Sequence, residues 1–175
     1  MKRLTMTLCA AAALAVPVSA SAQETTPTPK EAAKAACKAE RAAVGKATWK
    51  ATWRSNGLGR CINNRAKTED ANADNAAKQC KAERDDANFA AGHDGKTFEQ
   101  FYGTNKNGKN AYGKCVSGKA KDASEAQTEA RVNAAKTCKA AKKADADAFA
   151  TAWGTKKNAF GKCVSATAKA KNDES

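Results

Sequence analysis

The feature that most constrains this chain is an ordered set of residues that recurs three times. Each copy holds a cysteine, an aromatic pair, a glycine and a second cysteine. The copies end in Gly59-Arg60-Cys61, Gly113-Lys114-Cys115 and Gly161-Lys162-Cys163. The aromatic pairs, four residues apart, are Trp49 and Trp53, Phe98 and Tyr102, and Phe149 and Trp153. Three matches in the same order indicate internal duplication of one unit.

The first cysteine of each copy stands in a second recurring string. Cys37 and Cys80 are each followed by Lys-Ala-Glu-Arg, and Cys138 is followed by Lys-Ala-Ala-Lys. The second copy is longer than the others because of an insertion at 88–96 and a longer loop at 105–109. Insertions between matching ends are expected in surface loops, so both segments are predicted to lie at the surface.

The amino-terminal segment predicts export. Lys2 and Arg3 precede a mostly apolar stretch, 4–18, and small residues follow it. This order is typical of a secretory signal peptide, residues 1–22, with cleavage after Ala22. The apolar run is shorter than the roughly 20 residues that cross a bilayer, and no other stretch could do so. We therefore expect a protein that is secreted, periplasmic or associated with the cell wall, without a transmembrane segment after cleavage.

Cleavage removes Cys9 and leaves an even set of six cysteines. In an oxidising compartment such a set is typical of a disulfide framework. The repeat favours pairing within each unit, namely Cys37 with Cys61, Cys80 with Cys115, and Cys138 with Cys163. The alternative is a metal or haem site, which needs closely spaced ligands. No two of these cysteines are that close and His93 is the only histidine, so we expect no metal and no cofactor.

Three strings carry a resemblance to other proteins: Cys80-Lys81-Ala82-Glu83-Arg84, Tyr102-Gly103-Thr104-Asn105 and Tyr112-Gly113-Lys114-Cys115-Val116-Ser117. The chain resembles uncharacterised exported proteins of actinobacterial type with a repeated aromatic-Gly-Lys-Cys-Val-Ser unit. The resemblance covers most of the mature chain. It implies secretion and repetition, and it carries no activity.

Periodicity predicts long helices. Apolar residues recur at helical spacing from Cys61 to Ala87, and again from Val116 to Ala141. Each of these helices joins the second cysteine of one unit to the first cysteine of the next. An earlier helix is expected to start at Thr28-Pro29-Lys30-Glu31, which matches a capping box. That helix should weaken near Gly45.

Between the cysteines of each unit we expect a short helix that carries the aromatic pair. Thr97 and Gln100 would cap the second of these helices, and Gly103 or Gly154 would end its counterparts. An aromatic pair facing a disulfide is expected to fill the core, although it could also be a stacking platform for sugars or bases. Carboxylates at 85–86 and at 145 and 147 are predicted near helix starts.

These patterns predict an all-α protein of three tandem disulfide-stapled helical repeats, with long helices shared between neighbouring units. The predicted divisions are a linker at 23–28, repeat 1 at 29–67, repeat 2 at 68–121, repeat 3 at 122–172 and a tail at 173–175. The mature chain has few bulky apolar side chains. Closing a loop near 25 residues contributes about 3 to 4 kcal/mol, so the disulfides are expected to supply much of the stability.

No set of residues predicts catalysis. His93 stands alone beside Asp94, which does not assemble a nucleophile, a base and an oxyanion site. The mature cysteines are expected to be consumed in disulfides, which leaves no free thiolate. We therefore expect a protein that is not an enzyme.

The basic balance is the one feature that suggests a ligand, since the net charge is +13. The candidate contacts for an anionic envelope or extracellular polymer are Lys136, Lys139, Lys142, Lys143, Lys156, Lys157, Lys162, Lys169 and Lys171. A simpler interpretation is that these lysines keep an Ala-rich surface soluble. The alternative function is a structural or protein-interaction module that binds an unidentified envelope protein. Export argues against intracellular nucleic acid as the partner.

Overall fold

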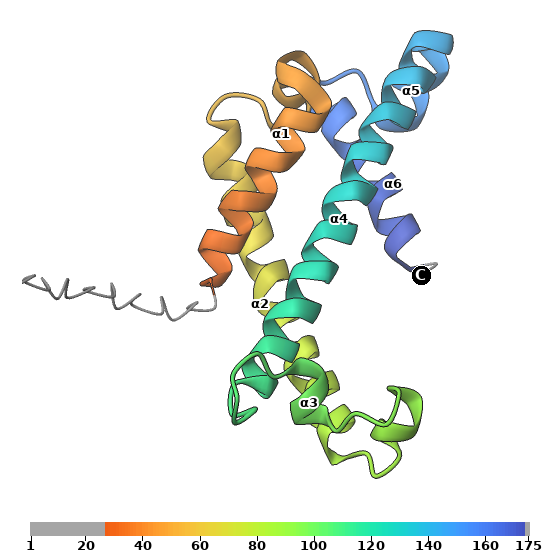
Figure 1. Cartoon of the computed structure of the whole chain (residues 1–175). Helices are drawn as coiled ribbons and strands as arrows, with labels where there is room; N and C mark the ends of the chain where they lie inside the picture. Colours follow the sequence, from red (N-terminus) through yellow and green to blue (C-terminus); the bar gives the residue numbers. More distant parts are fainter. Residues whose placement is uncertain (1–26, 174–175) are drawn as a thin grey trace, which may run out of the picture.

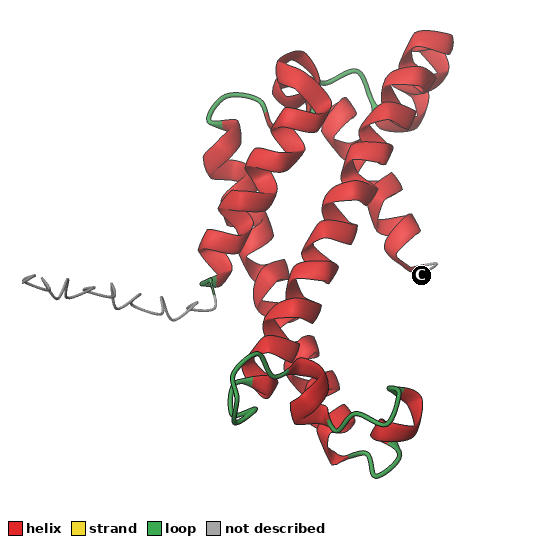
Figure 2. Ribbon diagram, in the orientation of Figure 1, coloured by secondary structure: helices red, strands yellow, loops and turns green. Residues whose placement is uncertain are grey.

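The structure, a computed structural model, describes residues 27–173. The regular secondary structure of these residues is entirely helical, without strands (Figure 2). Four long helices alternate in direction (Figure 1): α1 (Pro29–Trp53), α2 (Gly57–Asp85), α4 (Ala111–Ala144) and α6 (Ala159–Asp173). Shorter elements connect them: η1 (Phe89–Gly92), α3 (Phe98–Tyr102) and α5 (Ala146–Trp153). The all-α prediction is confirmed.

The long helices pack into a bundle from which one end projects. Helix α1 forms a hairpin with α2, α4 packs beside α2, and α6 packs beside α4. Helix α1 also contacts both α4 and α6. The last turns of α2 and the first turns of α4 extend beyond α1 and carry η1 and α3 (Figure 1). We name this projecting part, residues 80–118, the distal lobe.

The three disulfides have the predicted pairing. Their sequence separations are 24, 35 and 25 residues, and their Cα–Cα distances are 6.0, 5.9 and 6.1 Å. These distances fall within the range that disulfides normally span. The pairs are Cys37–Cys61, Cys80–Cys115 and Cys138–Cys163, and all six residues are buried.

The predicted sharing of long helices is confirmed as well. Helix α2 contains both Cys61 and Cys80, and α4 contains both Cys115 and Cys138. The division between repeats 1 and 2 therefore falls inside α2, and the next division falls inside α4. The interpretation of the three units as duplicated repeats, with their boundaries, stays a prediction.

Each aromatic pair lies on the helical segment that was expected, with one difference in the first unit. There the segment is part of α1, which is interrupted at Gly45, where φ is 76° and ψ is 162°. The predicted weakening at this glycine is confirmed. The capping boxes predicted at Thr28 and Thr97 are both present, and Gly103 and Gly154 follow α3 and α5 directly.

The core consists of three clusters, each centred on one disulfide. The first aromatic residue of each pair is buried, and the second packs against the same cluster from a half-buried position. The aromatic pairs therefore fill the core, as expected. Val44 packs against both the first and the third cluster, whereas the second cluster lies apart in the distal lobe. The first and third units are thus packed together.

The insertion at 88–96 does not lie wholly at the surface, which corrects the prediction. Phe89 is buried in the second core cluster, and its ring centroid lies 5.6 Å from that of Phe98. His93 stacks on Phe89 at 3.8 Å, and its Nδ1 lies 2.7 Å from the Phe89 carbonyl oxygen. The second unit has no tryptophan, and Phe89 supplies apolar volume there.

The prediction for Asp85 and Asp86 is wrong. Asp85 ends α2 and Asp86 follows it, so both lie at a helix end rather than a start. The Asp86 carboxylate accepts a hydrogen bond from the Asn88 N–H and so closes the next turn. Asp145 does occupy the predicted role, because its carboxylate caps α5 by accepting the Ala148 N–H.

The predicted signal peptide and most of the predicted linker lie outside the described residues. Between residues 27 and 173, no helix combines the length and the apolar character that spanning a bilayer requires.

Candidate functional site

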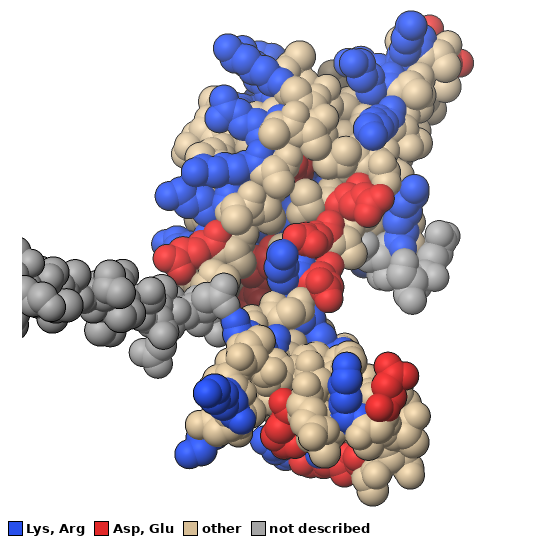
Figure 3. Space-filling model, viewed as in Figure 1, with Lys and Arg blue, Asp and Glu red and all other residues tan. Residues whose placement is uncertain are grey.

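All nine lysines predicted to contact a polyanion are exposed. Four lie on α4, two in the connection between α5 and α6, and three on α6. Residues 134–173 contain these nine lysines and only three aspartates. In the view of Figure 3, basic side chains lie over α1 and over the end of α4 near α5, whereas acidic side chains gather over the middle of α4. The surface formed by residues 134–173 is therefore strongly cationic.

The structure does not gather the nine lysines into one site. Lys142 and Lys143 lie in the last turn of α4, where a positive charge complements the helix dipole. Lys136 lines a groove between α1 and α4, and Lys162 lines a separate pocket at the start of α6. The nine predicted lysines thus spread over a broad surface, which has two hollows at its margins.

The groove between α1 and α4 is the larger hollow, with a volume of about 1740 Å³. One wall is a stripe of small side chains on α1: Ala32, Ala35, Ala36, Ala39 and Ala43. The opposite wall, on α4, includes Val116, Ala120 and Val132. Charges of both signs border it, among them Lys121 and Glu125, which form an ion pair. The groove is mainly apolar and has no strong net charge.

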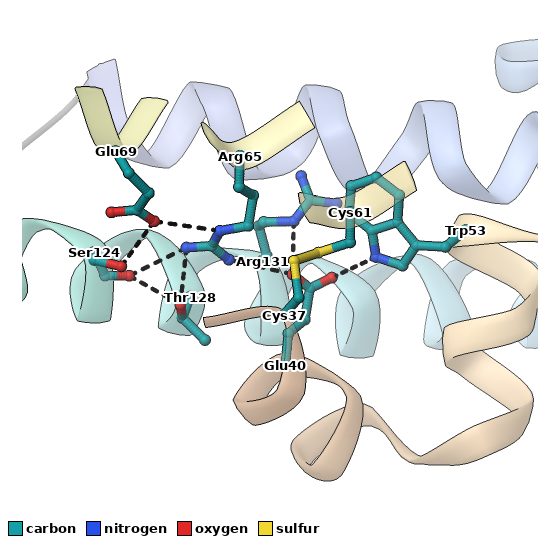
Figure 4. Close-up of a disulfide and its surroundings, with 9 residues drawn as sticks. All are labelled: Cys37, Glu40, Trp53, Cys61, Arg65, Glu69, Ser124, Thr128 and Arg131. Carbon is teal, nitrogen blue, oxygen red and sulfur yellow. Dashed lines mark hydrogen bonds and ion pairs between the residues drawn. A yellow bond between two sulfur atoms is a disulfide. The ribbon is translucent and has the colours of Figure 1, made fainter. Parts of the chain in front are cut away.

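A buried ionic cluster lies beside the first disulfide. Glu40 follows Cys37 by one helical turn, and Arg65 follows Cys61 by one turn, so the disulfide brings the two side chains together (Figure 4). Arg65 Nη1 lies 3.3 Å from Glu40 Oε2, and the two side chains are only 4% and 2% exposed. We name this group the Glu40 cluster.

Two more residues bind the Glu40 carboxylate. Arg131 of α4 donates from Nε to Oε2 over 3.0 Å, and Trp53 donates from Nε1 to Oε1 over 3.0 Å. The Arg131 guanidinium also lies 4.7 Å from the centroid of the Trp53 ring, in cation–π geometry. A single carboxylate therefore links α1, α2 and α4 (Figure 4).

Arg65 bridges the cluster to α4 on its other side. Its Nη2 donates to the Ser124 carbonyl and to Thr128 Oγ1, and its Nε lies 3.7 Å from the Glu69 carboxylate. Burial lowers the pKa of Arg65, and the two carboxylates oppose that effect. Two guanidiniums balance two carboxylates. Among the described residues, no buried side-chain nitrogen or oxygen lacks a hydrogen-bond partner.

A counterpart of this cluster lies beside the second disulfide, in the distal lobe. Glu83 follows Cys80 by three residues, as Glu40 follows Cys37. The Glu83 carboxylate accepts a hydrogen bond from the Tyr102 hydroxyl and forms an ion pair with Lys119 Nζ, both at 2.8 Å. Burial raises the pKa of Glu83, but the bonds from Lys119 and Tyr102 outweigh it, and the net shift is downward. We name this group the Glu83 cluster.

The third unit has no such cluster. The corresponding positions hold Ala141 and Thr167, and the Thr167 hydroxyl lies 3.8 Å from the Cys138 sulfur. Neither ionic cluster was predicted from the sequence. The signal was present, because a residue one turn beyond each bridged cysteine must face its counterpart, and the acidic residue recurs in the Lys-Ala-Glu-Arg strings.

The second hollow is a pocket of about 500 Å³ where the end of α1, the start of α2, α4 and the start of α6 meet. We name it the junction pocket. Four cations line it, Arg54, Arg60, Arg131 and Lys162, and no carboxylate of the described residues does. Of these only Lys162 was among the predicted contacts. The arginines were missed because they come from separate parts of the sequence.

Within residues 27–173, no three side chains of His, Cys, Asp or Glu come together in a way that could hold a metal ion. His93 packs between aromatic rings of the distal lobe, 4.6 Å from Phe101 by ring centroids. Comparison with known proteins finds no match to this chain among family models, curated proteins or solved structures.

Proposed function

We propose that this chain is an exported, disulfide-crosslinked helical protein that binds an anionic polymer of the cell envelope or its surroundings. The observation that supports the proposal is the cationic surface formed by the C-terminal end of α4, by α6 and by the connection between α5 and α6, with nine exposed lysines and three aspartates in residues 134–173. The three disulfides fit an oxidising compartment, where such a polymer would be met.

A repeating anion suits a surface of this kind. Each lysine that neutralises a charge on the polymer releases condensed counterions, so several weak contacts add to useful affinity at low salt. Lysines are point charges on flexible stems and need no enclosed pocket to contact a polymer. The helices, joined by three disulfides, would hold those charges on a fixed frame.

Retention on polyanion matrices tests the proposal. The oxidised mature chain, residues 23–175, should bind heparin and immobilised polyphosphate at low salt and elute as salt rises. A variant with Lys139, Lys142, Lys143 and Lys156 replaced by Gln should elute at clearly lower salt. The matched control replaces Lys34, Lys38, Lys46 and Lys50 of α1, which removes the same charge elsewhere.

Two results would contradict the proposal. If the unmodified chain flows through both matrices at low salt, it does not bind polyanions. If the α1 variant loses as much retention as the variant with Lys139, Lys142, Lys143 and Lys156 replaced, net charge alone explains the retention. The surface formed by residues 134–173 then makes no specific contribution to binding.

A second candidate function is a protein-interaction module, and the groove between α1 and α4 favours it. Its wall of alanines and valines could accept an apolar helix of an envelope protein. This function predicts a saturable complex from envelope extract that persists at high salt. A complex that dissociates with salt would instead favour the polyanion proposal.

A further inference from the structure

The junction pocket differs from the rest of the cationic surface in being concave and built from four segments. Arg54 follows α1, Arg60 lies in the first turn of α2, Arg131 lies on α4 and Lys162 lies on α6. Residues that are far apart in sequence and carry the same charge therefore line one hollow. Such a convergence is costly without an anion, because nearby like charges repel one another.

The charges in this pocket are unequally compensated. Arg131 pairs with Glu40 and stacks on Trp53, which holds its guanidinium in place. Arg54, Arg60 and Lys162 are exposed and form no ion pair with any described residue. The pocket thus combines one fixed guanidinium with three cations available to a ligand.

The backbone around the pocket is closely fixed. A Cβ atom on Gly161 would lie 2.8 Å from the Thr52 carbonyl oxygen, so α6 meets the end of α1 in direct backbone contact. Arg54 has φ 63° and ψ −151°, a conformation that residues other than glycine rarely adopt. Strained backbone conformations of this kind cluster at active sites and ligand clamps.

The remaining lining indicates what accompanies the anion. Asn64, Asn158 and Ser165 offer neutral hydrogen-bonding groups beside the cations. The Trp53 ring is covered by the Arg131 guanidinium, so it is not free to stack a nucleic-acid base. Arginine forks match the tetrahedral oxygens of phosphate. Hydroxyl groups on the ligand would be paired by the amides and the serine.

We propose that the junction pocket binds a phosphate group carried on a sugar or polyol chain. This inference rests on the proposed function and specifies where one phosphate of the polymer is held. The cationic surface of α4 and α6 would then attract the chain, and the pocket would fix its register. The volume of about 500 Å³ lies in the range of small-ligand sites.

Titration of the ¹⁵N-labelled oxidised chain with glycerol 3-phosphate tests the pocket, followed through the tryptophan indole N–H signals. The Trp53 signal should shift and saturate, whereas the signal of Trp153, which lies in the third core cluster and outside the pocket, should stay in place. Inorganic phosphate should bind more weakly, because it lacks the polyol hydroxyls. The double variant Arg54→Gln/Arg60→Gln should lower the affinity for glycerol 3-phosphate about tenfold or more.

The matched control is Lys139→Gln/Lys142→Gln, which removes the same charge from α4 outside the pocket. It should leave the titration unchanged while lowering the salt at which polyphosphate releases the protein. Lys162→Gln, on a different helix, is a second pocket variant and should weaken binding in the same direction. It keeps the test decisive if the double arginine variant does not fold.

The outcomes separate this inference from the proposed function. Retention on polyphosphate with an unshifted Trp53 signal overturns the pocket and leaves the polymer function standing. Saturable binding at Trp53 without retention overturns the polymer function and leaves a small phosphate site. Equal affinity for inorganic phosphate and glycerol 3-phosphate overturns the polyol part of the proposal.

Discussion

The Glu40 and Glu83 clusters have the same plan and different surroundings. In each, a carboxylate one turn beyond a bridged cysteine meets a cation and an aromatic donor. Glu40 and Arg65 are 2% and 4% exposed because α4 covers them, whereas Glu83 and Lys119 are 30% and 28% exposed in the distal lobe. The disulfide determines which residues meet, and tertiary packing determines how much each charge depends on its partner.

That difference has energetic consequences. A buried charge that loses its partner keeps its desolvation penalty without compensation, which makes breaking a buried pair far more costly than breaking an exposed one. A water-accessible pair is largely compensated by solvent. The two clusters therefore provide matched substitutions within one chain.

The largest expected effect comes from Arg65→Met, which keeps the length of the side chain and removes the guanidinium. Glu40 and Glu69 then lose a buried partner, and the free energy of unfolding should fall by about 3 to 5 kcal/mol. Urea denaturation with the disulfides intact measures it. The control Lys119→Met in the distal lobe should cost about 0 to 1 kcal/mol. Equal losses for the two variants would show that burial does not distinguish the clusters.

The two equivalent glycines before the second and third units' closing cysteines give the next largest contrast. Gly161→Ala would place its methyl group against the Thr52 carbonyl, and we expect a loss of about 1 to 3 kcal/mol as α6 shifts away from α1. Gly113 has no atom within 4 Å of the same position. Gly113→Ala should therefore stabilise α4 by about 0.5 to 1 kcal/mol. Thermal unfolding of both variants measures the difference, and a harmless Gly161→Ala would contradict the close contact of α1 with α6.

Tyr102→Phe should have a smaller effect. It removes the hydroxyl that donates to Glu83 and leaves the ring in the second core cluster, so a loss of about 0.5 to 1.5 kcal/mol is expected. Lys119 and water remain as partners of the carboxylate. The same urea experiment measures the change. A loss as large as that of Arg65→Met would mean that the distal lobe depends on this hydrogen bond as the bundle depends on its buried cluster.

The smallest expected effect is a dependence on pH in the distal lobe. The pKa of Glu83 is lower in the folded chain than its ordinary value of 4.5. Its contribution to stability is therefore present above that pH and is lost as the pH falls through the folded pKa. The stability difference between the unmodified chain and Glu83→Gln should shrink below pH 4.5. The double variant Tyr102→Phe/Lys119→Met, which lacks both donors, should lose most of this dependence.

Much of the fold could be predicted because it depends on neighbouring residues. Thr28 with Glu31 and Thr97 with Gln100 cap helices across three residues, and apolar spacing indicates the long helices. The disulfide pairing followed from matching each cysteine to its place in the recurring unit. Phe89 escaped prediction because its burial depends on where α3 lies against α4, and no local pattern specifies that contact.

The sequence by itself determined the long helices, the capping boxes at Thr28 and Thr97, the three crosslinks and the excess of lysine over acidic residues. The tertiary structure alone decided that Arg131 reaches Glu40, 91 residues away, and that Arg54 and Arg60 share a hollow with Lys162. The reason is physical. Helix formation and bridge spacing follow from short-range geometry, whereas the approach of α1 to α4 and α6 depends on how Val44, Gly161 and the buried charges pack together.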